Sequence, residues 1–257
     1  MDSNMKITFL GTGTSQGIPV IGCDHEVCLS KDPKDKRLRS SLLVESNGVS
    51  VVIDCGPDFR QQMLNANVSK LDGIIFTHNH ADHTVGLDDT RPLTNMHGAL
   101  AIYAKEDVIA DLKARFNYIF ATKNKYFGAP QLDVYLIVNK PFSVGSLSIT
   151  PIEIEHGKLK IFGFRFQNMA YITDASHISE EEMKKLKGLD ILIINALRIK
   201  PHPTHFNLQQ ALAVINKVKP KKAYLTHISH KLGFYQLVSK QLPKNVFLAY
   251  DGLVLKV

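Results

Sequence analysis

The chain has 257 residues, enough for one large domain or two small ones with a full hydrophobic core. Its composition, 44% hydrophobic and 21% charged, excludes a disordered chain, and no run approaches the ~20 apolar residues of a membrane span. The net charge of +7 favours an anionic partner. The N-terminus lacks the apolar stretch of a signal peptide, and three cysteines do not make a disulfide framework, so we expect a cytoplasmic protein.

Short strand patterns dominate the first half of the chain, at residues 6–10, 42–45 and 49–54. A buried-looking run at 71–77 precedes a histidine-rich stretch. A strand at 99–104 and a helix at 106–116 follow it, and then strands at 148–155, 161–167 and 170–173. Beyond Ser179, a good helix N-cap, helices alternate with strands. The elements expected there are helix 180–187, strand 190–195, helix 208–217, strand 223–226, helix 232–241, and strands 246–249 and 253–257.

Two blocks of strands, each followed by helices, predict an α/β (α+β) fold in which two sheets pack face to face with helices outside. No repeat or Gly/Ser linker divides the chain. In such an architecture the loops that carry polar side chains gather along one edge, where a rigid scaffold can hold them.

Three imidazoles and a carboxylate occur within six residues, in His78-Asn79-His80-Ala81-Asp82-His83. Neutral imidazole and carboxylate are ligands that zinc, manganese and iron prefer. His78 and His80 are two residues apart, so at the end of a strand they point to the same side. Asp82 and His83 diverge from them and can serve a second ion. The cluster predicts a metal-dependent enzyme.

Two ions need more ligands than this cluster contains. Three polar residues each end an apolar strand pattern, namely His156, Asp174 and His227. Each of them alone is typical of an ordinary loop. Together with the histidine-rich stretch, they are candidate ligands.

These residues resemble the metallo-β-lactamase superfamily of binuclear hydrolases, whose signature His-x-His-x-Asp-His matches residues 78 to 83. The resemblance implies an αββα sandwich with two mixed sheets, forming a single domain over residues 1–257. It also implies the ligands. The first ion takes His78, His80 and His156; the second takes Asp82, His83 and His227, with Asp174 bridging. Asp54 matches the family's upstream Asp-x-Gly. The resemblance implies that Asp54 is a catalytic residue that supports the site and is not a primary metal ligand.

The segment from Gly22 to Cys28 resembles the extra zinc-binding loop of PhnP-type phosphodiesterases, here at about residues 22–30. That loop carries Cys-x-Cys-x-x-Cys, and a His three residues after the last catalytic His completes the site. This chain has Cys23, His25 and Cys28, with His230 three residues after His227. Because Cys2His2 is a tetrahedral zinc set, the resemblance implies one structural zinc ion.

The reaction that the resemblance implies is hydrolysis of a phosphate diester. PhnP-type enzymes act on phosphoribosyl 1,2-cyclic phosphate. Two zinc or manganese ions, or iron, can share a hydroxide that attacks in line. His205 corresponds to the His that these enzymes present before a helix, and we expect it to act as the general acid, with Asp82 in the catalytic group. His202 lies close to it in sequence, whereas His97 and His177 are expected on the surface.

Two other functions stay open. The first is an RNA endonuclease resembling RNase Z, which processes tRNA 3′ ends. Basic and aromatic residues that could bind a strand interleave between Lys113 and Tyr126: Lys113, Arg115, Phe116, Tyr118, Phe120, Lys123, Lys125 and Tyr126. The second is a metal-binding sensor or scaffold without turnover.

We expect a small anionic phosphodiester as the partner, with nucleic acid as the alternative, no membrane, and a possible homodimer. The glycine-rich stretch from Gly11 to Gly17 does not match a nucleotide-binding motif, since Gln16 replaces the third glycine. We interpret it as a tight turn beside the metal site.

Overall fold

The computed structural model describes residues 5–123 and 126–257. Within them, two seven-stranded sheets pack face to face. The first sheet has the spatial order β14 (Val254–Lys256), β1 (Lys6–Gly11), β2 (Ser41–Ser46), β3 (Val49–Ile53), β4 (Gly73–Ile75), β5 (Leu100–Ala104) and β6 (Leu132–Leu136). The second has the order β13 (Val246–Leu248), β12 (Lys222–Thr226), β11 (Ile191–Asn195), β10 (Met169–Ile172), β9 (Leu159–Phe166), β8 (Leu147–His156) and β7 (Phe142–Val144).

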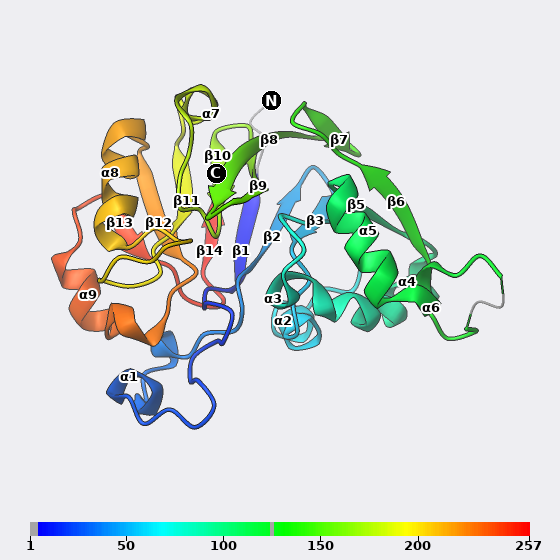
Figure 1. Cartoon of the computed structure of the whole chain (residues 1–257), viewed down its shortest axis with the longest axis horizontal. Coiled ribbons are helices and arrows are strands. Elements are labelled where there is room, and N and C mark those ends of the chain that lie inside the picture. Colours follow the sequence, from blue (N-terminus) through cyan, green and yellow to red (C-terminus); the bar gives the residue numbers. More distant parts are fainter. Residues whose placement is uncertain (1–4, 124–125) are drawn as a thin grey trace.

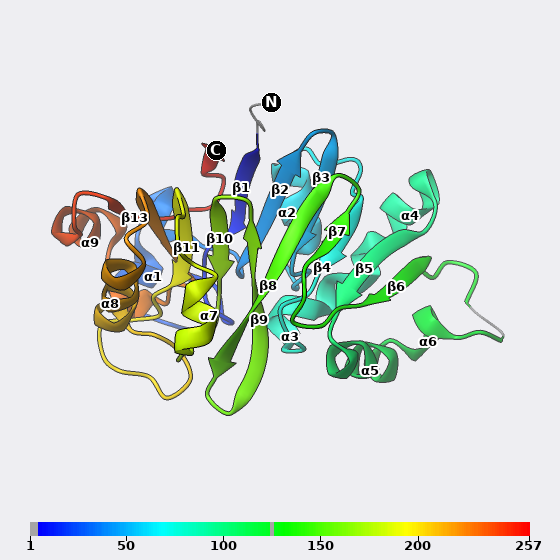
Figure 2. The same cartoon turned by 90° about the horizontal axis from the view of Figure 1, so that it is seen from above.

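Helices cover the outer faces of the two sheets, and the views in Figures 1 and 2 agree on this arrangement. The first sheet carries α2 (Phe59–Asn65), α3 (Ala81–Thr84), α4 (Arg91–His97), α5 (Glu106–Arg115) and α6 (Asn117–Phe120). The second carries α7 (Glu180–Lys184), α8 (Leu208–Val218) and α9 (Tyr235–Gln241). Short 3-10 turns lie at Pro33–Asp35, Val85–Thr90 and His230–Leu232. The predicted αββα arrangement is therefore confirmed.

Side chains of the central strands alternate between two cores, because successive residues of a strand point to opposite faces. In β11, Ile191 and Ile193 enter the core between the sheets, whereas Leu192 and Ile194 pack under the helices of the second sheet. Every residue of β11 is buried. This two-sided burial is why the strand reads as a continuous apolar run instead of an alternating one.

A long excursion between β1 and β2 carries α1 (Glu26–Leu29) and the first 3-10 turn, and it projects from the lower end of the molecule in Figure 1. Its own small core contains Ile18, Val27 and Cys28. Among the described residues, no helix is both long and apolar enough to span a bilayer.

Several element boundaries differ from the sequence prediction for identifiable reasons. β3 ends at Ile53 instead of residue 54, because Asp54 adopts a left-handed backbone with φ 64°. The helix predicted at 232–241 begins only at Tyr235, since Gly233 at φ 114° separates it from the turn at His230–Leu232. β6, β7, α2 and α4 were not predicted, because their short apolar patterns are weak.

Candidate metal centre

The strands of the sandwich bring their carboxyl ends to one edge. β3 and β4 run parallel in the first sheet, as do β10, β11 and β12 in the second. β8 runs in the same direction as β10, because both are antiparallel to β9. Polar side chains that follow such strands therefore meet at the mouth between the sheets. This geometry explains how residues 54, 78–83, 156, 174 and 227 converge.

Three of these positions have an unusual backbone. Asp54, Asp174 and His227 each come one or two residues after a strand, and their φ angles are 64°, 58° and 52°. A left-handed conformation is uncommon for a residue with a side chain, although Asp, Asn and His tolerate it best. The sharp turn after each strand aims the side chain into the centre. Such strain persists only where the surrounding structure fixes it, and it is typical of functional sites.

The histidine-rich stretch follows β4 and supplies the first-sheet side of the centre. The ring atoms of His78, His80 and His156 lie within 4.8 Å of one another, so that one ion could bind all three. A second group of this kind contains His78, His83 and Asp174. The Nε2 atoms of His78 and His83 are buried without a well-directed hydrogen bond. Buried polar atoms rarely stay unpaired. These two nitrogens are therefore suited to coordinate a metal ion.

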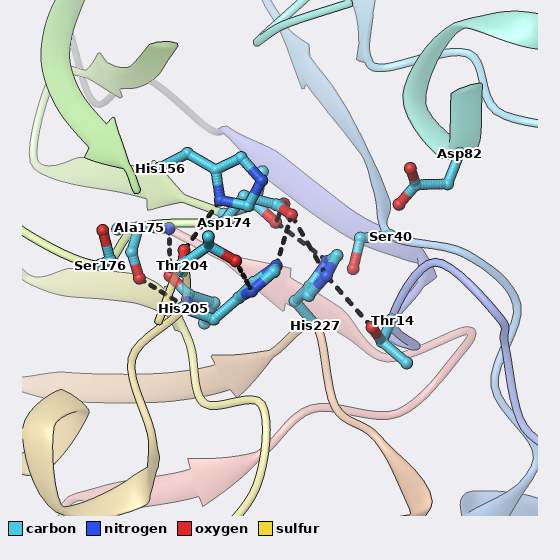
Figure 3. A network of polar contacts seen from close by, with 12 residues as sticks. Thr14, Ser40, Asp82, His156, Asp174, Ala175, Ser176, Thr204, His205 and His227 are labelled. Atoms are coloured by element: carbon cyan, nitrogen blue, oxygen red, sulfur yellow. Dashed lines mark hydrogen bonds and ion pairs between the residues drawn. The ribbon is translucent and has the colours of Figure 1, made fainter. Parts of the chain in front are cut away.

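Asp174 lies at the middle of the centre. Its Oδ1 is 3.0 Å from His205 Nε2 and 3.2 Å from His227 Nε2, and its Oδ2 is 3.3 Å from His83 Nε2. Figure 3 shows this carboxylate among His156, His205 and His227, with Asp82 on the facing side. The Oδ2 of Asp82 lies 3.1 Å from His83 Nε2.

Three of the imidazoles are held at their other ring nitrogen. His83 Nδ1 lies 2.7 Å from Asp54 Oδ2, and His156 Nδ1 donates to the Thr204 carbonyl at 2.8 Å. His78 Nδ1 lies 2.9 Å from the Thr77 hydroxyl. Such outer contacts fix the tautomer, so that Nε2 is left free to bind an ion.

The environment of the centre shifts the pKa values of its histidines in different directions. Burial lowers the pKa of His78 well below its ordinary value, and it lowers the pKa of His227 to about 4. Burial would also lower the pKa of His83, but the carboxylates of Asp174, Asp82 and Asp54 outweigh it and raise that pKa. Neutral rings at 78 and 227 are in the form that binds a metal, and the carboxylates around His83 offer the charge that a cation neutralises.

The second candidate site lies in the N-terminal excursion. Cys23, Cys28 and His230 come together with their ligand atoms within 4.8 Å, both cysteines are free, and the buried His230 Nδ1 has no partner. His25 stands outside this group. Its Nδ1 accepts from the Val27 N–H at 3.2 Å, which caps α1, and its ring centroid is 5.0 Å from that of His230.

The other histidines lie as expected. His97 and His177 are exposed. Cys55 is fully buried in the first-sheet core, as a small apolar residue would be.

The basic and aromatic stretch between Lys113 and Tyr126 is used mainly for packing. Phe116, Tyr118 and Phe120 pack against the core under α5 and α6. Tyr118 also donates to Asp88 at 2.5 Å. Lys125 lies outside the described residues.

Some supporting residues were not identified from the sequence. Asn195 ends β11, accepts from the Ala175 N–H at 2.9 Å and donates to the Ala175 carbonyl at 3.0 Å, which fixes the chain just after Asp174. The Thr14 hydroxyl lies 3.4 Å from His227 Nε2. In the sequence, Asn195 was distinguished only by its place at a strand end, and Thr14 only by its place in the glycine-rich turn. Neither residue type by itself predicts a supporting role.

Comparisons with known proteins agree with this geometry. Residues 50–228 match the β-lactamase superfamily domain. The chain is 41% identical to the octanoyltransferase of Porphyromonas gingivalis over 97% of its own length, but it spans only about half (51%) of that protein. It is 25% identical to the ribonuclease Z of Borrelia recurrentis, covering 98% of this chain and 97% of that one.

Among solved structures, a diphosphatase of the PhnP family aligns with a TM-score of 0.92 and 42% identity, over 98% of both chains. Zinc-bound PqqB from Methylobacterium extorquens aligns with a TM-score of 0.80 over 98% of this chain and all of that one, and its 18% identity shows the fold alone. The chain therefore belongs to the metallo-β-lactamase superfamily, and over nearly its whole length it is similar to a PhnP-family diphosphatase.

Proposed function

We propose that this hydrolase uses two divalent ions to cleave small phosphate diesters, cyclic ones included. The observation that carries the proposal is the convergence of ligands from both sheets on Asp174, with the ring of His205 3.0 Å from the same carboxylate. The 42% identity to a PhnP-family diphosphatase supports phosphorus–oxygen chemistry at this site.

The ligands divide between the two sheets. His78, His80 and His156 would hold the first ion. Asp82, His83 and His227 would hold the second, and Asp174 would bridge the pair. When bound, two such ions supply Lewis acidity and a nucleophilic water at neutral pH. Zinc, manganese and iron all suit imidazole and carboxylate donors.

The protein groups around the ions would orient the ligands and protonate the leaving oxygen. Asp54 and the Thr204 carbonyl hold His83 and His156 in the tautomer that presents Nε2. His205 is 12% exposed, and its ring lies between those of His156 and His227. It is therefore placed to give a proton at Nε2 to the leaving oxygen.

Cys23, Cys28 and His230 would hold a structural zinc ion, while His25 caps α1 and stays outside this ligand set. These thiols must stay reduced to bind metal, which a cytoplasmic location provides. The site would tie the excursion to the segment just beyond His227.

One alternative has its own support. The alignment with ribonuclease Z covers nearly the whole chain, so precursor tRNA is a second candidate substrate. Against it, Phe116, Tyr118 and Phe120 pack against the core, which leaves Tyr126 as the exposed aromatic side chain of that stretch. A sensor or scaffold without turnover is the remaining alternative.

The test joins metal analysis to a substrate panel. Purified protein, loaded in turn with zinc, manganese or iron, is assayed on a bis-aryl phosphate, cyclic ribose phosphates, cyclic nucleotides, a diphosphate ester and precursor tRNA. We expect turnover of small diesters that requires about two ions beyond the structural one. Processing of precursor tRNA that weakens steeply with salt would favour the nuclease. No turnover in any fully loaded form would support the scaffold.

A further inference from the structure

The loop between β11 and α8 carries two histidines, and only His205 has a role in the proposed reaction. The ends of the loop are pinned together: Leu197 N–H donates to the Phe206 carbonyl at 3.0 Å, and Leu208 N–H donates to the Arg198 carbonyl at 3.0 Å. Within the loop, the Arg198 guanidinium donates to the carbonyls of Lys200 and Pro201 at 3.1 and 2.6 Å. The half-buried His202 is therefore held by a fixed backbone.

His202 faces His205 nitrogen to nitrogen. The two Nδ1 atoms are 3.1 Å apart, and the ring centroids are 4.9 Å apart. The Thr204 hydroxyl lies between them, 2.9 Å from His205 Nδ1 and 3.3 Å from His202 Nδ1. These three side chains form a compact polar cluster on the side of His205 that faces away from Asp174.

Hydrogen accounting fixes which ring donates. The Thr204 backbone N–H donates to His202 Nδ1 at 3.3 Å, so that atom is an acceptor and carries no hydrogen. A hydrogen shared between the two Nδ1 atoms, 3.1 Å apart, therefore belongs to His205. Its Nδ1–H then points to His202 and the Thr204 hydroxyl, and its Nε2 must point the other way, toward Asp174 Oδ1 at 3.0 Å.

We propose that His202 is a positioning residue, whose Nδ1 receives the Nδ1–H of His205 and so keeps His205 Nε2 turned into the metal centre. The arrangement repeats the logic of a catalytic base held by a third group. Without the acceptor at 202, the His205 ring can turn over and present carbon where the leaving oxygen needs a proton. The surroundings support this role: burial and the neighbouring His205 lower the pKa of His202, which keeps it a neutral acceptor. The role rests on the proposed diesterase function.

The activity test uses paired variants and paired substrates. His202→Phe keeps a flat ring but removes the acceptor, whereas His202→Gln offers a carbonyl oxygen in its place. On an alkyl diester, we expect H202F to lose about 10- to 100-fold in kcat with KM unchanged, as outer contacts of catalytic groups typically do. On an aryl diester with a good leaving group, H202F should retain most activity. H202Q should recover part of the loss. The matched control, His97→Phe on the exposed surface, should behave as the parent on both substrates.

A second measurement does not depend on turnover or on any variant. In zinc-loaded protein labelled with 15N-histidine, long-range proton–nitrogen spectra should show a protonated Nδ1 for His205 and an unprotonated Nδ1 for His202. A bare His205 Nδ1 would overturn the proposal, as would equal losses by H202F on both diesters or no loss on either. If the parent hydrolyses no diester, the proposed function fails, and the spectrum still decides whether His202 holds His205.

Discussion

Asp54 supports the candidate ligands from a buried position. It is fully buried, its Oδ1 accepts from the Thr77 N–H at 2.8 Å, and its Oδ2 lies 2.7 Å from His83 Nδ1. Thr77 in turn contacts His78 through its hydroxyl at 2.9 Å. One carboxylate therefore orients two candidate ligands, one directly and one through a threonine.

Replacement of Asp54 by Asn keeps the shape but removes the charge that fixes His83. We expect Asp54→Asn to weaken metal binding about 10- to 100-fold, because a loosened imidazole binds an ion less tightly. Isothermal titration of metal-free protein with zinc measures this. An exposed control, Asp107→Asn, should bind as the parent does. Unchanged affinity in Asp54→Asn would show that Thr77 and the fold suffice to hold His83.

The role of His205 is tested by the leaving group. His205→Ala should lose about 100-fold or more on an alkyl diester, whose alkoxide needs a proton. It should lose much less on an aryl diester, whose leaving group is stable without one. Steady-state assays on the two substrates give the ratio. Equal losses on both would remove the acid role.

At the level of elements, strands were easier to predict than short helices. The long runs that became β8 and β9 were predicted within two residues of their ends, because each side of those strands meets a core. α2 and α4 have seven residues each and little apolar periodicity, so tertiary contacts decide them. The excursion between β1 and β2 was recognised by its cysteines. The sequence could not show that His25 would turn to cap α1.

The excursion allows a sharp test of its metal ligands. We expect Cys28→Ser to lose one equivalent of zinc and to lower the melting temperature, since a thiolate is removed from the Cys23, Cys28 and His230 group. His25→Gln should keep the ion, because His25 caps the helix in this structure. Metal analysis and thermal unfolding of both variants decide the matter. Loss of the ion in His25→Gln would place His25 among the ligands.

Across the whole molecule, the candidate ligands come from both sheets. Residues 78–83 follow β4 of the first sheet, whereas in the second sheet His156 ends β8, and Asp174 and His227 follow β10 and β12. The sequence could identify these residues, since their types and strand-end positions are visible in it. The left-handed backbones of Asp174 and His227, and the partners Asn195, Thr77 and Thr204, depend on contacts between distant segments. Those partners could therefore not be predicted from the sequence.

Ions held from both sheets should stabilise the sandwich as well as act on substrate. Ligand bound at a thousandfold excess over its dissociation constant stabilises a fold by about 4 kcal/mol. Removal of the metal with a chelator should therefore lower the melting temperature and speed hydrogen exchange at the strand ends beside the centre. Cys28→Ser protein, which we expect to lack the structural ion, isolates the contribution of the two ions in the metal centre. An unchanged melting temperature after complete removal of the metal would contradict this stabilisation of the two sheets.

A half-buried carboxylate, that of Asp251, gives the fold its own pH dependence, remote from the metal centre. Burial raises the pKa of Asp251 to about 6, even though the Thr12 hydroxyl and the Leu38 N–H donate to it at 2.7 and 2.6 Å. Nearby, Arg37 is fully buried and donates to Thr12 and to the Ala249 carbonyl at 2.7 and 2.6 Å. These contacts join the excursion to the turn before β14.

The folded chain therefore binds the Asp251 proton more tightly than the unfolded chain does. Stability from this group is full below pH 4 and is lost as the pH rises to about 6, a change of at most about 3 kcal/mol. Urea unfolding of the parent and of Asp251→Asn across this range measures the difference. The Asn variant should lack this component of the slope, and parallel curves would contradict the assignment.

The left-handed turns after β3, β10 and β12 set a trade-off for the evolution of this chain. Glycine adopts such a backbone freely, whereas aspartate and histidine adopt it at a cost of about 1 kcal/mol or more each. A glycine at position 174 would therefore relax the main chain while it abolished the centre. A variant that has lost these side chains need not be less stable. Selection for activity, and not for stability, would therefore retain them.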